Sequence, residues 1–279
     1  MEDIPILTDE QKNFFELNGF LIVEDALPPE FVDRINQCLE AVGAKIREER
    51  GAGPNDKIDQ RNMVGTNFET IIPLVDWHCT VPLVCQLLNS NIHIITSHFI
   101  EVPPAPHEKK RDQLPTGFHR DGGTSVRDLK EPFPQMFIKI GYSLSDQSES
   151  DSGGLQVVPG SHRLIGPPPS LNGGSVPHGA IEVRIKPGSA VFFENRMVHG
   201  SLPNFSDKPR RSLYMGYGYR WVRPMDYAQM PPEILDKCNP VQRQLLSDES
   251  YDFGHYIPKD EDVPIRALIE EAKAKGAAA

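Results

Sequence analysis

The sequence predicts a mainly β fold, a double-sheet jelly roll with flanking helices. It contains about seven or eight short apolar or β-branched runs separated by turns, and these runs do not alternate with helical patterns. The 26 prolines and 22 glycines among 279 residues also indicate many turns. Without crossover helices, a parallel sheet is disfavoured. We expect one domain over residues 1–279, with a helical segment over 8–45, a jelly-roll core over about 65–222 and a helical tail over about 230–279.

The amino-terminal segment is predicted to pack against this core. Thr8-Asp9-Glu10-Gln11 is a capping box that begins a helix, and Gly19 is suited to end it. The apolar run Phe20–Val23 predicts a short buried strand. Pro28-Pro29 opens a second helix whose apolar side chains share one face. Residues 43–62 are polar and rich in glycine, which predicts a loop.

The remaining strands are expected in the central part of the chain, after one short helix. The helix is predicted over 81–88, and the strands over 92–102, 135–144, 155–158, 180–185, 190–193 and 212–219. Between the first two strands lies a proline-rich polar segment, 103–111, directly before the histidine motif described below. This segment is either a lid or a solvated loop.

Charge and composition exclude several classes of partner. A net charge of −10 disfavours nucleic acid and anionic membrane surfaces, which select basic proteins. The chain has no apolar run of the roughly 20 residues that cross a bilayer, and its amino terminus lacks a signal-peptide pattern. Its four cysteines have no metal-binding spacing and are expected to be reduced thiols. We therefore expect a cytoplasmic protein with a small-molecule substrate; a homo-oligomer and a monomer both remain open.

Three side chains far apart in the sequence have the chemistry of a metal site. His119 and Asp121 are two residues apart, so on a strand both can face one ion. His199 lies 80 residues later, after the strand over 190–193. Two imidazoles and one carboxylate form the facial triad of non-haem Fe(II) oxygenases, which leaves positions for a 2-oxo acid and O₂.

A 2-oxo acid bound at such a triad needs a partner for its distal carboxylate. Arg210 and Arg211 follow His199 at the start of the last strand, and a guanidinium binds a carboxylate through two hydrogen bonds. Strand alternation allows only one of these two arginines to face the interior of the jelly roll.

Several motifs occur in the order found in a known family. They are His119-Arg120-Asp121, the run GGLQVVPGSH over 153–162, Pro187-Gly188, and His199-Gly200-Ser201 followed by Arg210, with Phe14–Val23 as a similar opening. The chain thereby resembles the phytanoyl-CoA dioxygenase family of Fe(II)/2-oxoglutarate oxygenases over residues from about 8 to 226.

The resemblance implies a double-stranded β-helix core of the cupin-like kind, with helices against one sheet. It also implies Fe(II) bound by His119, Asp121 and His199, and 2-oxoglutarate bound by Arg210, the arginine that the family offset favours over Arg211. By analogy with the ectoine hydroxylase branch, Ser201 donates to the same carboxylate.

The resemblance implies a dioxygenase that hydroxylates an unactivated C–H of a small organic molecule and releases succinate and CO₂. Three alternatives stay open: desaturation, epimerisation, ring rearrangement or endoperoxide formation with the same cofactors; a non-catalytic jelly-roll binding module; and a zinc hydrolase. Other candidate residues are less specific. Lys139 or Tyr142 could contact the cosubstrate, Arg220–Arg223 could line the cavity mouth and Lys109–Arg111 could attract an anion, whereas His162 is expected to be structural.

Overall fold

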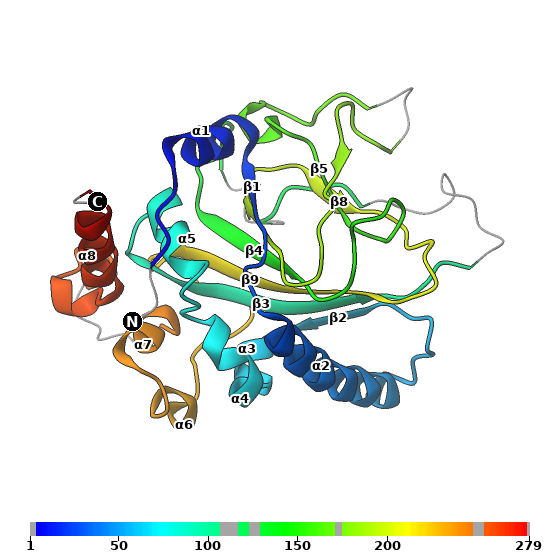
Figure 1. Ribbon diagram of the computed structural model, residues 1–279, viewed down its shortest axis with the longest axis horizontal. Coiled ribbons are helices and arrows are strands. Elements are labelled where there is room, and N and C mark those ends of the chain that lie inside the picture. Colours follow the sequence, from blue (N-terminus) through cyan, green and yellow to red (C-terminus); the bar gives the residue numbers. More distant parts are fainter. Residues whose placement is uncertain (1–3, 107–116, 123–128, 171–174, 248–253, 278–279) are drawn as a thin grey trace.

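The computed structural model of the protein describes residues 4–106, 117–122, 129–170, 175–247 and 254–277. Its centre is a six-stranded antiparallel sheet in the order β1-β7-β4-β9-β3-β2, and a three-stranded sheet in the order β6-β5-β8 lies across from it (Figure 1). The large sheet contains β1 (Phe20–Val23), β2 (Ile58–Arg61), β3 (Ile92–Val102), β4 (Phe137–Ser143), β7 (Ala190–Glu194) and β9 (Arg210–Tyr219). The small sheet contains β5 (Leu155–Val157), β6 (Ile181–Glu182) and β8 (His199–Ser201). The predicted double-sheet jelly roll is confirmed.

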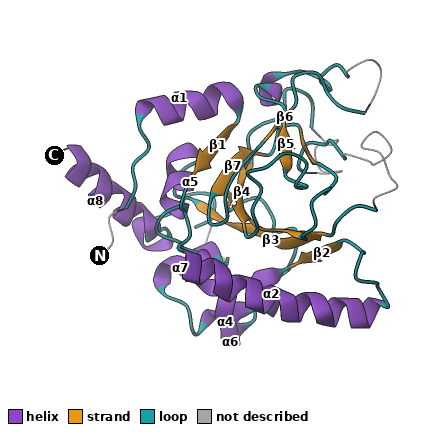
Figure 2. Cartoon of the chain, turned by 45° about the vertical axis from the view of Figure 1, so that its right-hand side comes forward, coloured by secondary structure: helices purple, strands orange, loops and turns teal. Residues whose placement is uncertain are grey.

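Helices cover the face of the large sheet that points away from the small one. Figure 1 shows α2, α3 and α4, and Figure 2 shows α2 and α4, beneath the large sheet on the side opposite to β5. The α-helices are α1 (Asp9–Asn18), α2 (Pro29–Arg50), α3 (Met63–Thr66), α4 (Phe68–Ile71), α5 (Val81–Leu87), α6 (Pro232–Leu235), α7 (Pro240–Leu245) and α8 (Ile265–Ala277). Short 3₁₀ helices occur at Ile72–Leu74, Ser161–Arg163 and Asp260–Asp262. The described helices lack the combination of length and apolarity needed to cross a membrane.

Alternation along the strands divides the core into two apolar layers. On β9, Leu213 and Met215 belong to the layer between sheet and helices, whereas Tyr214 belongs to the layer between the two sheets. On β7, Phe192 and Phe193 divide in the same way. Whatever stands in register with Tyr214 or Phe193 therefore faces the space between the sheets.

The local signals at the amino terminus are confirmed. The Thr8 hydroxyl accepts from the backbone N–H of Gln11, and the backbone N–H of Thr8 donates to the side-chain oxygen of Gln11. Gly19 ends α1 with φ 78°. A side chain at position 19 would lie 2.6 Å from the ring of His162, so glycine is also required there by packing.

The predicted loop over 43–62 is wrong. The second helix continues to Arg50, and β2 forms at Ile58–Arg61 along the edge of the large sheet. Ile46 and Ile58 are buried there, and Arg47 pairs with Glu101 on β3. The polar residues on the outer face of this amphipathic helix led to the loop prediction, because the sheet that its apolar face covers could not be seen in the sequence.

Candidate active site

A β-bridge brings two of the predicted metal ligands together. His119 N–H donates to the carbonyl of His199 at 2.9 Å, and His199 N–H donates back at 3.0 Å. Asp121 follows in a turn, where its N–H donates to the carbonyl of Asn195 at 3.0 Å. The expectation that both residues of the His-x-Asp pair lie on a strand therefore holds only for His119.

The three side chains converge. One ligand atom from each of His119, Asp121 and His199 lies within 4.8 Å of the other two. The Nε2 atoms of His119 and His199 are 3.7 Å and 3.8 Å from the two carboxylate oxygens of Asp121. Asp121 and His199 are buried, whereas His119 is exposed toward the opening.

Backbone carbonyls fix both imidazoles in the tautomer that a metal requires. Nδ1 of His119 lies 2.7 Å from the carbonyl of Gly117, and Nδ1 of His199 lies 3.0 Å from that of Met197. A carbonyl can only accept, so each Nδ1 carries a proton, and in the neutral ring each Nε2 has its lone pair available to a metal. Burial also lowers the pKa of His199 to about 4, so this ring is neutral near pH 7.

The Asp121 carboxylate is held ionised by neighbouring positive charge. Burial alone would raise the pKa of Asp121, but the Lys139 ammonium, 2.9 Å from Oδ1, outweighs burial and lowers that pKa. Within the described residues, Oδ2 is buried without a hydrogen-bond partner. An ionised oxygen and two Nε2 lone pairs directed at one point fit a divalent cation of the non-haem Fe(II) type.

The two adjacent arginines have different environments. Arg210 is 1% exposed, and Nη2 donates to the Tyr214 hydroxyl at 3.4 Å. Its Nε and Nη1 atoms are buried without an acceptor among the described residues. Arg211 lies on the helix side, where it donates to Glu101 at 2.8 Å and to Glu40 at 3.0 Å. A buried guanidinium with free donors fits a carboxylate ligand, whereas the Arg211 guanidinium already binds two carboxylates.

A cavity of about 550 Å³ contains the triad and opens between the sheets. This size is typical of sites for small organic ligands. Leu155, Phe193 and Tyr214 form part of its wall, and Ser201 lines it beside His199. Pro103–Pro106 lines it as well, so the described part of the proposed lid does border the site.

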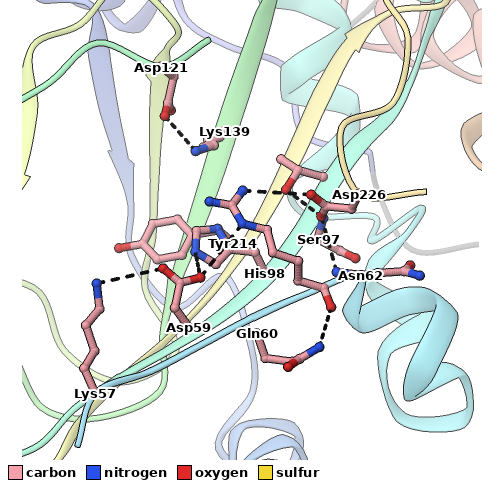
Figure 3. A network of polar contacts seen from close by, with 12 residues as sticks. Lys57, Asp59, Gln60, Asn62, Ser97, His98, Asp121, Lys139, Tyr214 and Asp226 are labelled. Atoms are coloured by element: carbon pink, nitrogen blue, oxygen red, sulfur yellow. Dashed lines mark hydrogen bonds and ion pairs between the residues drawn. The ribbon is translucent and has the colours of Figure 1, made fainter. Parts of the chain in front are cut away.

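One wall of the cavity was missed in the sequence because β2 was not foreseen. Nε2 of His98 on β3 lies 3.1 Å from Oδ1 of Asp59 on β2, and the His98 ring packs on Tyr214 at 5.4 Å (Figure 3). The interaction with His98 lowers the pKa of Asp59 to about 2. Lys57 lies 3.9 Å from the same carboxylate. The His-x-Asp motif of His119 and Asp121 could be found in the sequence because its residues are neighbours. No local signal indicates that His98 contacts Asp59.

Arg120, between the two ligands of the His-x-Asp motif, fastens this segment to its surroundings. Its guanidinium donates to the carbonyls of Arg196, Ser161, Leu164 and Gly166 at distances of 2.9–3.1 Å. These carbonyls belong to the segment before His199 and to the loop after β5. Arg120 is thus a positioning residue that ties together the elements carrying the ligands.

The other candidates are divided by strand alternation and distance. Lys139 faces the cavity, whereas Tyr142 is buried on the helix side and bonds to Thr80 at 2.7 Å. His162 interacts with the carbonyl of Glu16 at 3.0 Å, outside the cavity lining. In the segment 220–223, Trp221 stacks on Tyr219 at 5.3 Å, which is packing rather than a cavity mouth. Lys109–Arg111 lies outside the described residues.

Comparisons with known proteins show to which proteins the chain is similar. The family model described as phytanoyl-CoA dioxygenase (PhyH) matches residues 15–212. Dioxygenase cdmD of Talaromyces verruculosus is 29% identical over 146 residues, which are 50% of this chain and 46% of that protein. The peroxisomal phytanoyl-CoA dioxygenase of Rattus norvegicus is 22% identical, over 94% of this chain and 85% of that one. Among solved structures, HygX from Streptomyces hygroscopicus with nickel and 2-oxoglutarate bound has a TM-score of 0.59 at 16% identity, over 79% of this chain and 90% of that chain.

Proposed function

The chain belongs to the phytanoyl-CoA dioxygenase family, and from this premise we propose that it is an Fe(II)- and 2-oxoglutarate-dependent dioxygenase. It hydroxylates an unactivated C–H of a small organic molecule, with release of succinate and CO₂. One observation carries the proposal: two free Nε2 atoms and an ionised carboxylate converge between the sheets, and the buried guanidinium of Arg210, on the same face of β9 as Tyr214, has donors without acceptors among the described residues. A zinc hydrolase or a binding module has no need of that guanidinium.

His119, Asp121 and His199 would hold the iron, and Arg210 would bind the distal carboxylate of 2-oxoglutarate. Bound Fe(II) supplies the oxidising chemistry, with 2-oxoglutarate and O₂ as cosubstrates. Ser201 lines the same cavity and is proposed as a second donor to the carboxylate.

The chain contributes preorganisation and exclusion of water. The carbonyls of Gly117 and Met197 keep both imidazoles aimed before any ligand arrives. Phe193 packs on the His199 ring at 4.7 Å and, with Leu155, gives the cavity an apolar wall. An apolar wall favours an organic substrate and limits the access of bulk water to the reacting atoms.

We also propose that the protein acts in a reducing compartment such as the cytoplasm. The four cysteines, Cys38, Cys79, Cys85 and Cys238, all belong to the described residues and form no disulfide bond, which supports this location.

Two measurements test the function. Binding of Fe(II) and 2-oxoglutarate to the folded state should raise its stability by about 2.7 kcal/mol at 100 times the dissociation constant. O₂-dependent release of succinate should be lost in Asp121→Ala, while Tyr142→Phe, on the other face of β4, retains it. Full succinate formation by Asp121→Ala would contradict the assignment, and mass spectrometry of the product identifies hydroxylation against desaturation or rearrangement.

A further inference from the structure

Lys139 is a buried cation that the proposed mechanism does not use. Its side chain is 8% exposed, and Nζ donates to Asp121 Oδ1 at 2.9 Å (Figure 3). An ammonium group has three donors, and within the described residues Nζ binds this one acceptor. Lys139 also lines the cavity, so its remaining donors are available to a ligand there.

Lys139 lines the cavity, whereas the buried Arg210 lies outside its lining and at another point along β9. In the sheet Lys139 pairs with Gly216, six residues along β9 from Arg210, which is roughly 20 Å along the strand. Contacts lead from Arg210 to Tyr214 and from Tyr214 to Phe193, whose register partner on β4 is Lys139. If Arg210 binds the distal carboxylate of 2-oxoglutarate, Lys139 remains available to bind the substrate.

The charge balance of the cavity favours an anion at this position. Among the described residues, three basic and two acidic side chains line it, although the whole protein carries a charge of −10. The acidic Asp59 already interacts with His98 and Lys57. Asp121, the one acceptor of Lys139 among the described residues, would be shared with a divalent cation. With Fe(II) and the dianion 2-oxoglutarate bound, the charges of Asp121, Arg210 and Lys139 leave one positive charge in excess, which one further anion would neutralise.

We propose that the substrate is an organic acid whose carboxylate binds Lys139 Nζ while its apolar part packs on Phe193 and Leu155. This inference rests on the proposed function. A single ammonium matches the single charge of a carboxylate, whereas a phosphate dianion is usually bound by several donors. Lys139 would then place the oxidised C–H relative to the iron and select acids over neutral molecules.

The test compares acids with their uncharged isosteres. Calorimetry under argon, on protein saturated with Fe(II) and 2-oxoglutarate, measures dissociation constants for a panel of aliphatic and aromatic carboxylic acids and the matching primary carboxamides. At least one acid should bind about 30-fold or more tightly than its amide, as expected for a buried charge pair. Lys139→Met should abolish that preference, whereas Lys57→Met, which removes a half-exposed charge from the cavity rim, should change it less than about 2-fold.

A purely structural role gives a different result. Lys139→Gln keeps a donor for Asp121 without the charge, so it should bind Fe(II) and 2-oxoglutarate as the wild type does but show no preference for acids. The proposal is overturned if amides bind as well as acids throughout the panel, if the preference survives in Lys139→Met, or if both variants lose Fe(II). Failure of the wild type to bind 2-oxoglutarate would instead refute the proposed function.

Discussion

Replacing Arg210 by methionine should have two effects of opposite sign, because its guanidinium is buried for a ligand rather than for the fold. Without 2-oxoglutarate, the variant should be more stable than the wild type. With 2-oxoglutarate, it should lose most of the stabilisation that the ligand gives. Few substitutions of a fully buried residue are expected to stabilise a protein, so the sign alone is informative.

The magnitude follows from the two unpaired donors. Among the described residues, Nε and Nη1 of Arg210 have no acceptor, and a buried unsatisfied donor costs about 1–3 kcal/mol. Methionine removes this cost but fills less volume, so we expect a net gain of about 1–2 kcal/mol. Losing the charge partner of the distal carboxylate should cost 2–5 kcal/mol of binding, which weakens 2-oxoglutarate about 30-fold or more.

Arg211→Met is the matched control. It removes the ion pairs to Glu101 and Glu40 and leaves Glu101, which is buried, with Arg47 as its remaining partner. This variant should lose about 1–3 kcal/mol of stability while keeping the wild-type affinity for 2-oxoglutarate. Urea unfolding with and without 2-oxoglutarate, and calorimetry of 2-oxoglutarate binding, measure both quantities.

The reverse pattern would refute this reasoning. If Arg211→Met weakened 2-oxoglutarate and Arg210→Met did not, the competing arginine would be the ligand. If Arg210→Met destabilised the unliganded protein by several kcal/mol, its guanidinium would be bonded within the fold.

Three further predictions concern the surroundings of the site. Arg120→Gln leaves several backbone carbonyls without their donor, so Fe(II) affinity by calorimetry should fall about 10–100-fold; unchanged affinity would show that the His-x-Asp segment holds its geometry without this residue. Gly141→Ala places a methyl group 2.7 Å from the Tyr214 ring and should cost about 1–3 kcal/mol in urea unfolding; an unchanged midpoint would mean that the ring moves freely. Burial lowers the pKa of His93 to about 4. Between pH 6.5 and 4 the unfolded state therefore binds more protons than the folded state, and the free energy of unfolding decreases by up to about 3 kcal/mol as the pH falls through this range. In His93→Gln, the slope of unfolding free energy against pH in this range should correspond to about one proton fewer than in the wild type. An identical slope for variant and wild type would contradict the lowered pKa of His93.

Much of the candidate site was predictable because metal and carboxylate binding depend on particular side-chain types, which the sequence gives directly. Few other roles require a His-x-Asp pair, a distant histidine and an arginine at the start of a strand together. Alternation on β9 also required that one of two adjacent arginines face inward, and the structure places Arg210 between the sheets and Arg211 on the helix side. The caps of α1 were equally local and equally visible.

Other features depend on pairing between distant segments. The polar segment 43–62 contains the end of α2 and the edge strand β2. The strand forms because β3 provides backbone hydrogen-bond partners that no local sequence pattern indicates. The Asp59–His98 wall exists only through that pairing. In the same way, the contact between Lys139 and Asp121 follows from the packing of β4 beneath a turn 18 residues earlier in the chain.

The sequence alone determined which chemical groups this protein has for binding a metal and a keto acid, and in what order they occur. The tertiary structure decided which lone pairs are free, which guanidinium lacks acceptors and which cation faces the remaining space. The physical reason is that residue type and strand period are local properties, whereas burial, tautomer and charge pairing depend on neighbours that only the folded chain brings together.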